Sequence, residues 1–185
     1  DNTAGIVSRH APQVKIVNEK KQGVVFARIK GVAEAKGSIV AFIDADCIAP
    51  RLWLKNIKAA YNKPNIIAVG GYIIYEPKLR ASDIAERVTN TFCLIFNMMT
   101  TANSSFKKET YLKCGGFSPK VNLNEDLYIS LVLRKYGAIV VLKNNPVITS
   151  SRRFTSSNLV PYLYHSVINV FFIFLFKKAI FFDFE

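Results

Sequence analysis

Residues 38–47 read SIVAFIDADC, a run of small and β-branched apolar residues that ends in two carboxylates. Residues 39–43 do not alternate with polar ones, which is typical of a strand buried on both faces in the middle of a parallel sheet. Asp44 and Asp46 therefore follow the carboxyl end of this strand, the edge of an open α/β sheet where ligands bind. Asp is also common in ordinary polar turns, so these ten residues leave both interpretations open.

The two carboxylates are spaced for a hard cation. Asp44 and Asp46 leave the strand one residue apart and offer oxygen ligands only. Such a pair suits Mg²⁺ or Mn²⁺, especially where substrate phosphates supply the remaining ligands. The sequence therefore predicts a divalent metal site at this edge of the sheet.

The composition indicates one folded domain with anionic partners. A chain of 185 residues supports one full core, and half of its residues are hydrophobic, which excludes a disordered chain. Its 25 Lys and Arg against 13 Asp and Glu give a formal net charge of +12. That excess implies nucleic acid, an acidic membrane surface or phosphorylated substrates as partners. Cys47, Cys93 and Cys114 lie far apart, without metal-ligand spacing or a disulfide framework, which fits a reducing compartment.

Strands and helices are expected to alternate along most of the chain. Period and turn residues predict strands at 14–17, 39–43, 66–74, 138–142 and 147–149. They predict helices before Pro12 and at 24–36, 50–60, 82–99, 107–114 and 124–136. We therefore expect an α/β fold with a mainly parallel sheet that is covered by helices on both faces.

The C-terminal segment differs in character from the rest. In residues 159–176 only Pro161, His165, Ser166 and Asn169 lie outside the apolar and aromatic set. Eighteen residues is about the lower limit for crossing a bilayer core of roughly 30 Å. Polar residues on one helix face instead suit a helix in the membrane interface. We expect residues 1–158 to form the α/β core and residues 159–185 a hydrophobic, membrane-associated helical tail. An ordinary core helix is the alternative.

A second acidic pair lies at a predicted helix N-terminus. Glu125 and Asp126 follow a glycine-containing loop at 115–119. The helix dipole stabilises carboxylates there, so by itself the pair is equally consistent with simple capping.

Several short motifs follow one another along the chain. They are GVVFAR at 23–28, AKG at 35–37, FIDAD at 42–46, Pro50 with WL at 53–54, Asn103, GGF at 115–117 and ED at 125–126. In order and spacing they resemble the family 2 glycosyltransferases, the inverting, nucleotide-sugar-dependent enzymes of the GT-A fold. The resemblance runs from about residue 1 to residue 154. It implies a GT-A-like, Rossmann-like fold and an enzyme.

The resemblance implies transfer of a sugar from a nucleoside-diphosphate sugar to an acceptor hydroxyl. Mn²⁺ or Mg²⁺ would neutralise the leaving diphosphate as a Lewis acid. Asp46 is implied as the direct metal ligand, and Asp44 as a contact of the ribose or of a metal-bound water. Arg28 is implied close to the nucleotide, where a fixed cation can meet phosphate. A solvated charge on a helix is the alternative for Arg28.

The acceptor side is implied by the same resemblance. Inversion needs a general base that takes the proton of the acceptor hydroxyl. The family's motif gives that role to Asp126, with Glu125 lining the acceptor side. Asn103 and Gly116 are implied on the acceptor side as well.

Two arginines and the tail suggest further partners. Arg152 and Arg153 follow the last predicted strand, placed either to close over the diphosphate or to contact acidic lipid headgroups. We expect a lipid- or glycan-type acceptor, and the apolar tail favours a lipid-linked one at the cytoplasmic face of a membrane. No nucleic-acid partner is expected, because the basic residues are dispersed and most aromatic residues fall on apolar faces.

The chain also departs from the family pattern. The first strand and loop that bind the nucleobase, and the acidic turn after the second strand, are absent, and Ile29 replaces the usual Asn. We therefore expect an N-terminally incomplete enzyme that binds its donor poorly. A haloacid dehalogenase-type phosphatase also has Asp-x-Asp after a buried strand, but Ile48 stands where that motif needs Thr. The other alternative is a noncatalytic glycosyltransferase-like module that binds an anionic membrane surface.

Overall fold

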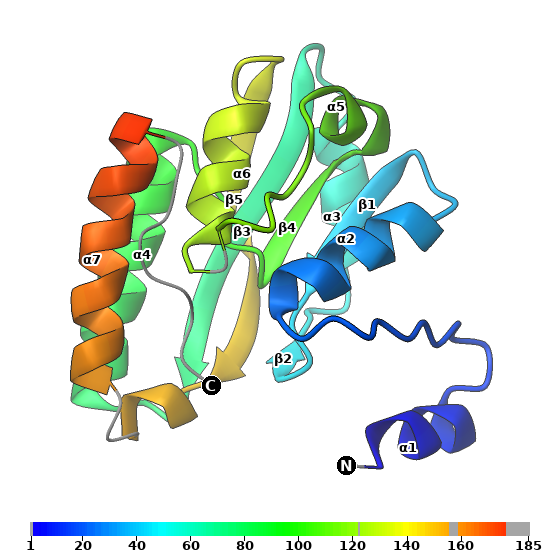
Figure 1. Ribbon diagram of the computed structural model, residues 1–185, viewed down its shortest axis with the longest axis horizontal. Coiled ribbons are helices and arrows are strands. Elements are labelled where there is room, and N and C mark those ends of the chain that lie inside the picture. Colours follow the sequence, from blue (N-terminus) through cyan, green and yellow to red (C-terminus); the bar gives the residue numbers. More distant parts are fainter. Residues whose placement is uncertain (1, 122, 156–158, 177–185) are drawn as a thin grey trace.

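The computed structural model describes residues 2–121, 123–155 and 159–176. The helices are α1 (Thr3–His10), α2 (Val24–Glu34), α3 (Trp53–Ala60), α4 (Arg80–Phe96), α5 (Lys108–Lys113), α6 (Glu125–Leu133), the 3₁₀ helix η1 (Arg152–Thr155) and α7 (Leu159–Phe176). The strands are β1 (Ile39–Ile43), β2 (Cys47–Ile48), β3 (Ile66–Glu76), β4 (Asn103–Lys107) and β5 (Ala138–Ser150). Figure 1 shows helices on both faces of one twisted sheet, as expected for an α/β fold.

The sheet is mixed, so the prediction of a mainly parallel sheet is wrong. Its order within the described residues is β1-β4-β3-β5-β2, and only β3 and β5 pair in parallel. β4 pairs antiparallel with both β1 and β3, and β2 pairs antiparallel with β5. β4 was not predicted because its sequence, NSSFK, lacks the apolar pattern of a strand. Its Ser104 and Ser105 are nevertheless buried between the neighbouring strands.

β1 has the predicted bounds but not the predicted position. Among the described residues it pairs with β4 alone, so it lies at an edge of the sheet, and only Val40 of its five residues is buried. The predicted strand at 14–17 is also wrong, because these residues form an irregular segment that runs beside α2. The strands predicted at 14–17 and 39–43 and the helix predicted at 24–36 would form a βαβ unit, and this unit is therefore absent from the described part of the chain.

Among the described residues, three hydrophobic clusters pack helices against the sheet or against one another. The first packs α2, α5 and α6 against one face, around the fully buried Phe106 of β4. The second packs α3 against the other face through Trp53 and Ile57. The third joins α4, α6 and α7 through Cys93, Leu127, Leu131 and Ile173. Each fully buried large side chain contributes about 1.5–3 kcal/mol, so these clusters fix the helices that carry the site residues.

In the middle of the sheet, the backbone of β3 lies very close to a side chain of β4 and to the backbone of β5. Gly70 and Gly71 predict a bulge or such an approach, and the register between β3 and β5 does shift between Gly71 and Ile73. A Cβ atom on Gly71 would lie 2.2 Å from Nδ2 of Asn103 and 2.7 Å from the carbonyl oxygen of Asn145. The prediction is confirmed, and the glycine makes room for Asn103.

The C-terminal helix α7 packs beside α6. Its Ile173 is fully buried among residues of α4 and α6. In the part of the chain that the structure describes, no helix has the length and apolar character needed to cross a membrane. Residues 177–185 of the predicted tail lie outside the described residues.

Candidate active site

A buried arginine joins the two acidic motifs. The side chain of Arg28, on α2, is 9% exposed. Its Nη2 donates a hydrogen bond to Oδ1 of Asp44 at 3.0 Å, and its Nη1 donates to Oε1 of Glu125. The acidic turn after β1 and the start of α6 therefore meet at one guanidinium, although they lie far apart in the sequence. Arg28 is not a solvated helix charge.

The position of Arg28 follows from the face of α2 on which it lies. Val25 and Val32, three residues before and four residues after Arg28, are fully buried in the first hydrophobic cluster. Side chains at these spacings share one helix face, so Arg28 points toward the core. The same spacing is visible in the sequence and is the signal that could have predicted its burial.

Glu125 is held from two sides. Its side chain is largely buried and accepts hydrogen bonds from Arg28 and from Oγ1 of Thr101, the latter at 3.3 Å. Thr101 is itself buried and precedes β4. Sequence reasoning did not find Thr101, because nothing in the polar stretch before the unrecognised strand β4 distinguishes it from its neighbours.

Asp126 has the electrostatics of a proton acceptor. The residue as a whole is partly exposed, but its carboxylate lies inward and accepts a hydrogen bond from the backbone N–H of Leu127 at 2.8 Å. Burial, together with the neighbouring charge of Glu125, raises the pKa of Asp126 from its ordinary 3.8 to about 7, against the lowering effects of the Leu127 N–H and of Arg28. A carboxylate with a pKa near neutrality suits general acid–base chemistry.

The start of α6 is fixed by neighbouring helices and loops. Asn124 has a left-handed backbone with φ 62°, a conformation that Asn tolerates better than most residues. Its Nδ2 donates to Oγ of Ser166 on α7 at 2.8 Å. Oγ of Ser130 donates to the carbonyl oxygen of Asp126 at 2.7 Å and accepts from the N–H of Met99 at 3.2 Å. The acidic pair thus stands on a well-anchored helix start.

The turn after β1 is more open than the start of α6. The carbonyl oxygen of Asp44 accepts the N–H of Cys47 at 3.0 Å, which closes the turn, and the carboxylates of Asp44 and Asp46 are both partly exposed. Nη2 of Arg152 forms an ion pair with Oδ2 of Asp46 at 3.4 Å. Arg153 is exposed next to it in η1. Arg152, one of the two arginines predicted near the diphosphate, therefore contacts the acidic turn.

The residues of this turn fit a metal only in part. Among the described residues, no cluster of three or more His, Cys, Asp or Glu side chains is arranged to hold a metal ion. The two carboxylates of Asp44 and Asp46 are hard oxygen donors of the kind that Mg²⁺ and Mn²⁺ prefer. They fit a cation that takes its other ligands from a diphosphate or from water.

Two residues predicted on the acceptor side, Asn103 and Gly116, make structural contacts in the core. Asn103 is buried, with Oδ1 accepting from Nε1 of Trp53 at 2.8 Å and Nδ2 donating to the carbonyl oxygens of Tyr72 and Asn145 at 2.9 and 2.8 Å. Its amide is used in the core, and the predicted acceptor contact of Asn103 stays a prediction. Gly116 is buried at φ 65°, where a Cβ would lie 2.4 Å from the ring of Tyr111. The close packing against Tyr111 requires glycine here, and the acceptor-side role of Gly116 stays a prediction.

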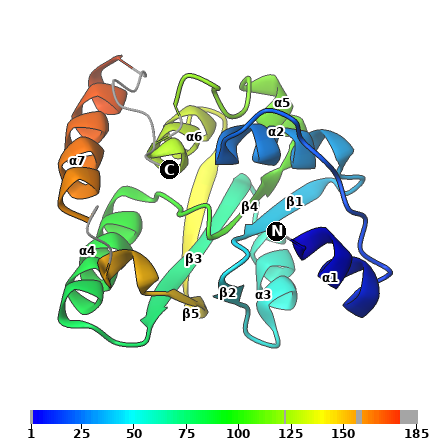
Figure 2. The same ribbon diagram turned by 60° about the horizontal axis from the view of Figure 1, so that its bottom comes forward.

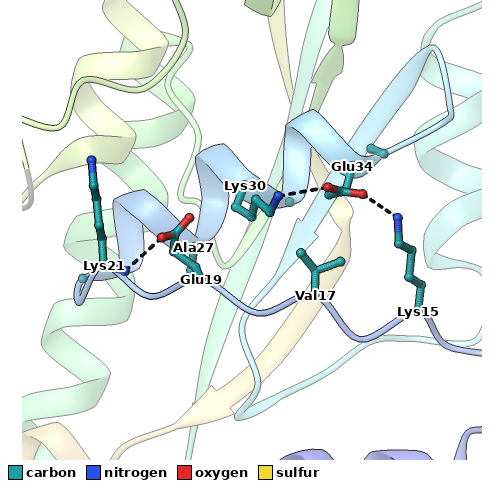
Figure 3. Close-up of a pocket in the computed structure, with 10 residues that line it drawn as sticks. Lys15, Val17, Glu19, Lys21, Ala27, Lys30 and Glu34 are labelled. Carbon is teal, nitrogen blue, oxygen red and sulfur yellow. Dashed lines mark hydrogen bonds and ion pairs between the residues drawn. The ribbon is translucent and has the colours of Figure 1, made fainter.

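A cavity of about 620 Å³ lies apart from these residues, between the segment at 15–23 and α2. Figure 3 shows its lysine and glutamate lining, in which Lys15 and Lys30 both bind Glu34. These two cations lower the pKa of Glu34 to about 2. None of the site residues predicted from the sequence lines this cavity.

Comparisons with known proteins agree with the motifs and the fold. A family model described as Glycosyl transferase family 2 matches residues 1–128. The glucosyl-dolichyl phosphate glucuronosyltransferase of Haloferax volcanii is 25% identical over 132 residues, in an alignment that covers 60% of this chain and 40% of the relative.

Solved glycosyltransferase structures share the fold. The mannosyltransferase PcManGT from Pyrobaculum calidifontis, in complex with GDP-Man and Mn²⁺, has a TM-score of 0.62 and 23% identity over 80% of this chain and 44% of its own. TarS 1-349 from S. aureus has a TM-score of 0.63 and 13% identity over 96% of this chain and 60% of its own. The likeness shows an α/β fold with a mixed sheet, similar to the GT-A glycosyltransferases.

The chain spans less than two thirds of the length of each of these relatives. The family match nevertheless covers more than half of the 185 residues and includes both acidic motifs, which Arg28 joins in space. This chain belongs to glycosyl transferase family 2.

Proposed function

We propose that the protein transfers a sugar from a nucleoside-diphosphate sugar to an acceptor hydroxyl with inversion at the anomeric carbon. The observation that carries the proposal is the contact of Arg28 with both Asp44 and Glu125. It brings a candidate acceptor carboxylate and a candidate donor carboxylate to Nη1 and Nη2 of one guanidinium. Family membership supports the same class of reaction.

The donor side is formed by the turn after β1. Asp46 and Asp44 would hold Mn²⁺ or Mg²⁺, and the bound cation would neutralise the charge of the leaving diphosphate. GDP-Man with Mn²⁺ in the structure of PcManGT supports this pairing of donor and metal. Arg28 contributes a fixed positive charge, and Arg152 and Arg153 are placed to approach the diphosphate from the solvent side.

The acceptor side is formed by the start of α6. The acceptor oxygen attacks the anomeric carbon, the bond from that carbon to the diphosphate oxygen breaks, and the acceptor proton passes to Asp126. Its raised pKa lets Asp126 bind that proton near neutral pH. Glu125, held by Arg28 and Thr101, lines the acceptor side and stays in place during the reaction.

We further propose a lipid-linked acceptor at a membrane surface, on its cytoplasmic face. The relative from Haloferax volcanii is named for a dolichyl phosphate substrate, which supports this acceptor class. The net charge of +12 favours an anionic surface. In this proposal residues 1–158 are the catalytic core, and residues 159–185 form the part that associates with the membrane.

The test is sugar transfer by the full-length protein with a panel of UDP- and GDP-sugars and Mn²⁺. Asp126→Asn is expected to lower kcat by roughly 10²–10⁴-fold, and Asp46→Ala to abolish the dependence on Mn²⁺. Asp83→Asn, which changes a carboxylate on α4 away from the site, is the matched control and should retain full activity. Unchanged transfer by Asp126→Asn would exclude Asp126 as the base. Membrane binding without any transfer would favour the noncatalytic module.

A further inference from the structure

Helix α4 turns its apolar stripe to the solvent. The residues Ile84, Val88 and Ile95 lie on one side of the helix, at the spacing that predicts a core-facing stripe, but all three are exposed. Phe96, beside Ile95, is exposed as well. A stripe of large apolar residues outside the core needs another apolar environment to cover it.

The opposite side of α4 contacts the sheet through polar groups. Asn90 accepts from the N–H of Ile73 at 3.0 Å and donates to the carbonyl oxygen of the same residue at 2.8 Å. Glu86 accepts from the N–H of Tyr75 at 2.9 Å. These side chains bind the backbone of β3, so part of the polar side of α4 faces the protein while its apolar stripe faces outward.

Helix α7 has the same arrangement. Ser166 accepts a hydrogen bond from Asn124, and Asn169 is completely buried, so its polar residues face the protein. Among residues 164–176 the exposed side chains are apolar or aromatic: Tyr164, Val167, Phe171, Phe174, Leu175 and Phe176. A helix with polar residues inward and apolar residues outward is arranged for apolar surroundings rather than for water.

The two helices are neighbours on one side of the molecule. Cys93 of α4 and Ile173 of α7 belong to one hydrophobic cluster, and Figures 1 and 2 both show the helices together at the same side. Their outward residues define the α4–α7 face: Ile84, Val88, Ile95, Phe96, Tyr164, Val167, Phe171 and Leu175. Aromatic side chains in such a face suit the boundary between headgroups and acyl chains.

The charges near this face favour an anionic surface. On α4 and in the four residues before it, Lys78, Arg80 and Arg87 are balanced by Glu76, Asp83 and Glu86, and Lys78 and Arg87 form ion pairs with Asp83 and Glu86. The helix η1, which contacts α7, adds Arg152 and Arg153 and no acid. Two copies of a chain with a net charge of +12 repel each other, whereas anionic lipid headgroups attract it.

We propose that the α4–α7 face docks on a lipid bilayer that contains anionic lipids. The proposal deepens the membrane association described above, because it assigns half of the docking surface to α4, outside the C-terminal segment. Insofar as the lipid-linked acceptor of the proposed function is correct, η1 connects this face to the site, since Arg152 binds Asp46.

Flotation of the full-length protein with vesicles tests the proposal. Vesicles of phosphatidylcholine and phosphatidylglycerol are expected to carry the protein upward, and added salt should weaken the binding. The double variant Val88→Asp/Ile95→Asp should lower the partition coefficient by roughly a hundredfold or more, because each buried aliphatic side chain contributes about tenfold. Val167→Asp on α7 provides an independent variant that should act in the same direction.

Matched controls separate this face from general hydrophobicity. Leu54 on α3 is 63% exposed, as is Val88, and Leu112 on α5 is 61% exposed. Leu54→Asp/Leu112→Asp should float like the wild type. Circular dichroism and thermal unfolding show whether each variant is folded, and exposed positions are expected to tolerate the change.

Three results would overturn the proposal. In the first, the wild-type protein does not float with the vesicles. In the second, the α4 variants are folded and float as well as the wild type. In the third, the wild type is a dimer in the absence of lipid, and the same α4 substitutions make it monomeric. The dimer would identify a second copy as the occupant of the face. Transfer to a soluble acceptor is measured in parallel: loss of transfer with intact flotation counts against the proposed function and leaves the docking surface in place.

Discussion

The start of α6, the proposed acceptor half of the site, is buried and interlocked, whereas the turn after β1, the proposed donor half, is more open. Arg28 is 9% exposed and binds two carboxylates, while Arg152 is 80% exposed and forms one ion pair at 3.4 Å. Both arginines contact the same acidic turn after β1. A buried guanidinium that is hydrogen-bonded to two carboxylates holds both of them in place. An exposed guanidinium with one ion pair can exchange its partner when another anion binds. The comparison therefore predicts that the contacts of Arg28 stay in place, whereas the contact of Arg152 with Asp46 is the one that can rearrange.

Removing the buried arginine should have the largest effect. Arg28→Ala leaves Glu125 without its cation in a largely buried position. A loss of about 3–5 kcal/mol in the free energy of unfolding is expected, because a buried charge loses its partner. Urea denaturation measures the change, and Arg152→Ala is the comparison within the same site. Equal effects of the two substitutions would contradict the contrast between the halves.

Titration of Asp126 should make both the free energy of unfolding and the rate of sugar transfer depend on pH, which is the second-largest effect that we expect. The folded protein binds the Asp126 proton more tightly than the unfolded chain does, because folding raises the pKa of this carboxyl from 3.8 to about 7. Raising the pH from about 4 to about 7 should therefore lower the free energy of unfolding, and Asp126→Asn should reduce that slope. Sugar transfer should instead increase through about pH 7 as Asp126 loses its proton. Denaturation and transfer profiles against pH test both signs.

The contact between α6 and α7 should have a smaller effect on stability. Ser166→Ala leaves Nδ2 of Asn124 without its acceptor, and an unpaired buried donor costs about 1–3 kcal/mol. We expect kcat to fall while KM for the donor stays the same, since Asn124 adjoins the acidic pair and not the donor turn. Thr91→Ala, at an exposed hydroxyl on α4, is the control. A change in donor KM alone would show that Ser166 acts elsewhere.

The exposed arginine should affect stability least. Arg152→Ala is expected to change the free energy of unfolding by about 0–1 kcal/mol, as for other surface ion pairs. Its effect should appear in KM for the nucleotide sugar. Arg87, 81% exposed and 3.6 Å from Asp83, provides a closely matched pair, so Arg87→Ala should change neither quantity. An unchanged KM for Arg152→Ala would remove Arg152 from the donor half.

The sequence predicted the elements that depend on local pattern. The bounds of β1, the helix α2 and the start of α6 follow from apolar period and from turn residues, and the structure has them at nearly the same residues. The two acidic motifs were recognised by their order and spacing, and both lie within the residues that the family model matches.

Features that depend on distant partners were not predicted. The polar stretch of β4 became a central strand because β1 and β3 pair with it on both sides, and no local pattern reports that pairing. The segment at 14–17 alternates like a strand but has no strand partner among the described residues. The stripe of α4 has the period of a core helix, yet the contacts of Asn90 and Glu86 turn it outward. Hydrophobic period shows that a face exists, and tertiary contacts decide what covers it.

The space at Gly71 limits which sequences can keep the hydrogen bonds of Asn103. A methyl group at this position would meet not only the Asn103 amide but also the main-chain oxygen of Asn145, 2.7 Å away. Shortening residue 103 would relieve the first clash and leave the second, so no single compensating substitution admits alanine. Any other chain built on the same crossing of three strands is therefore expected to carry glycine there.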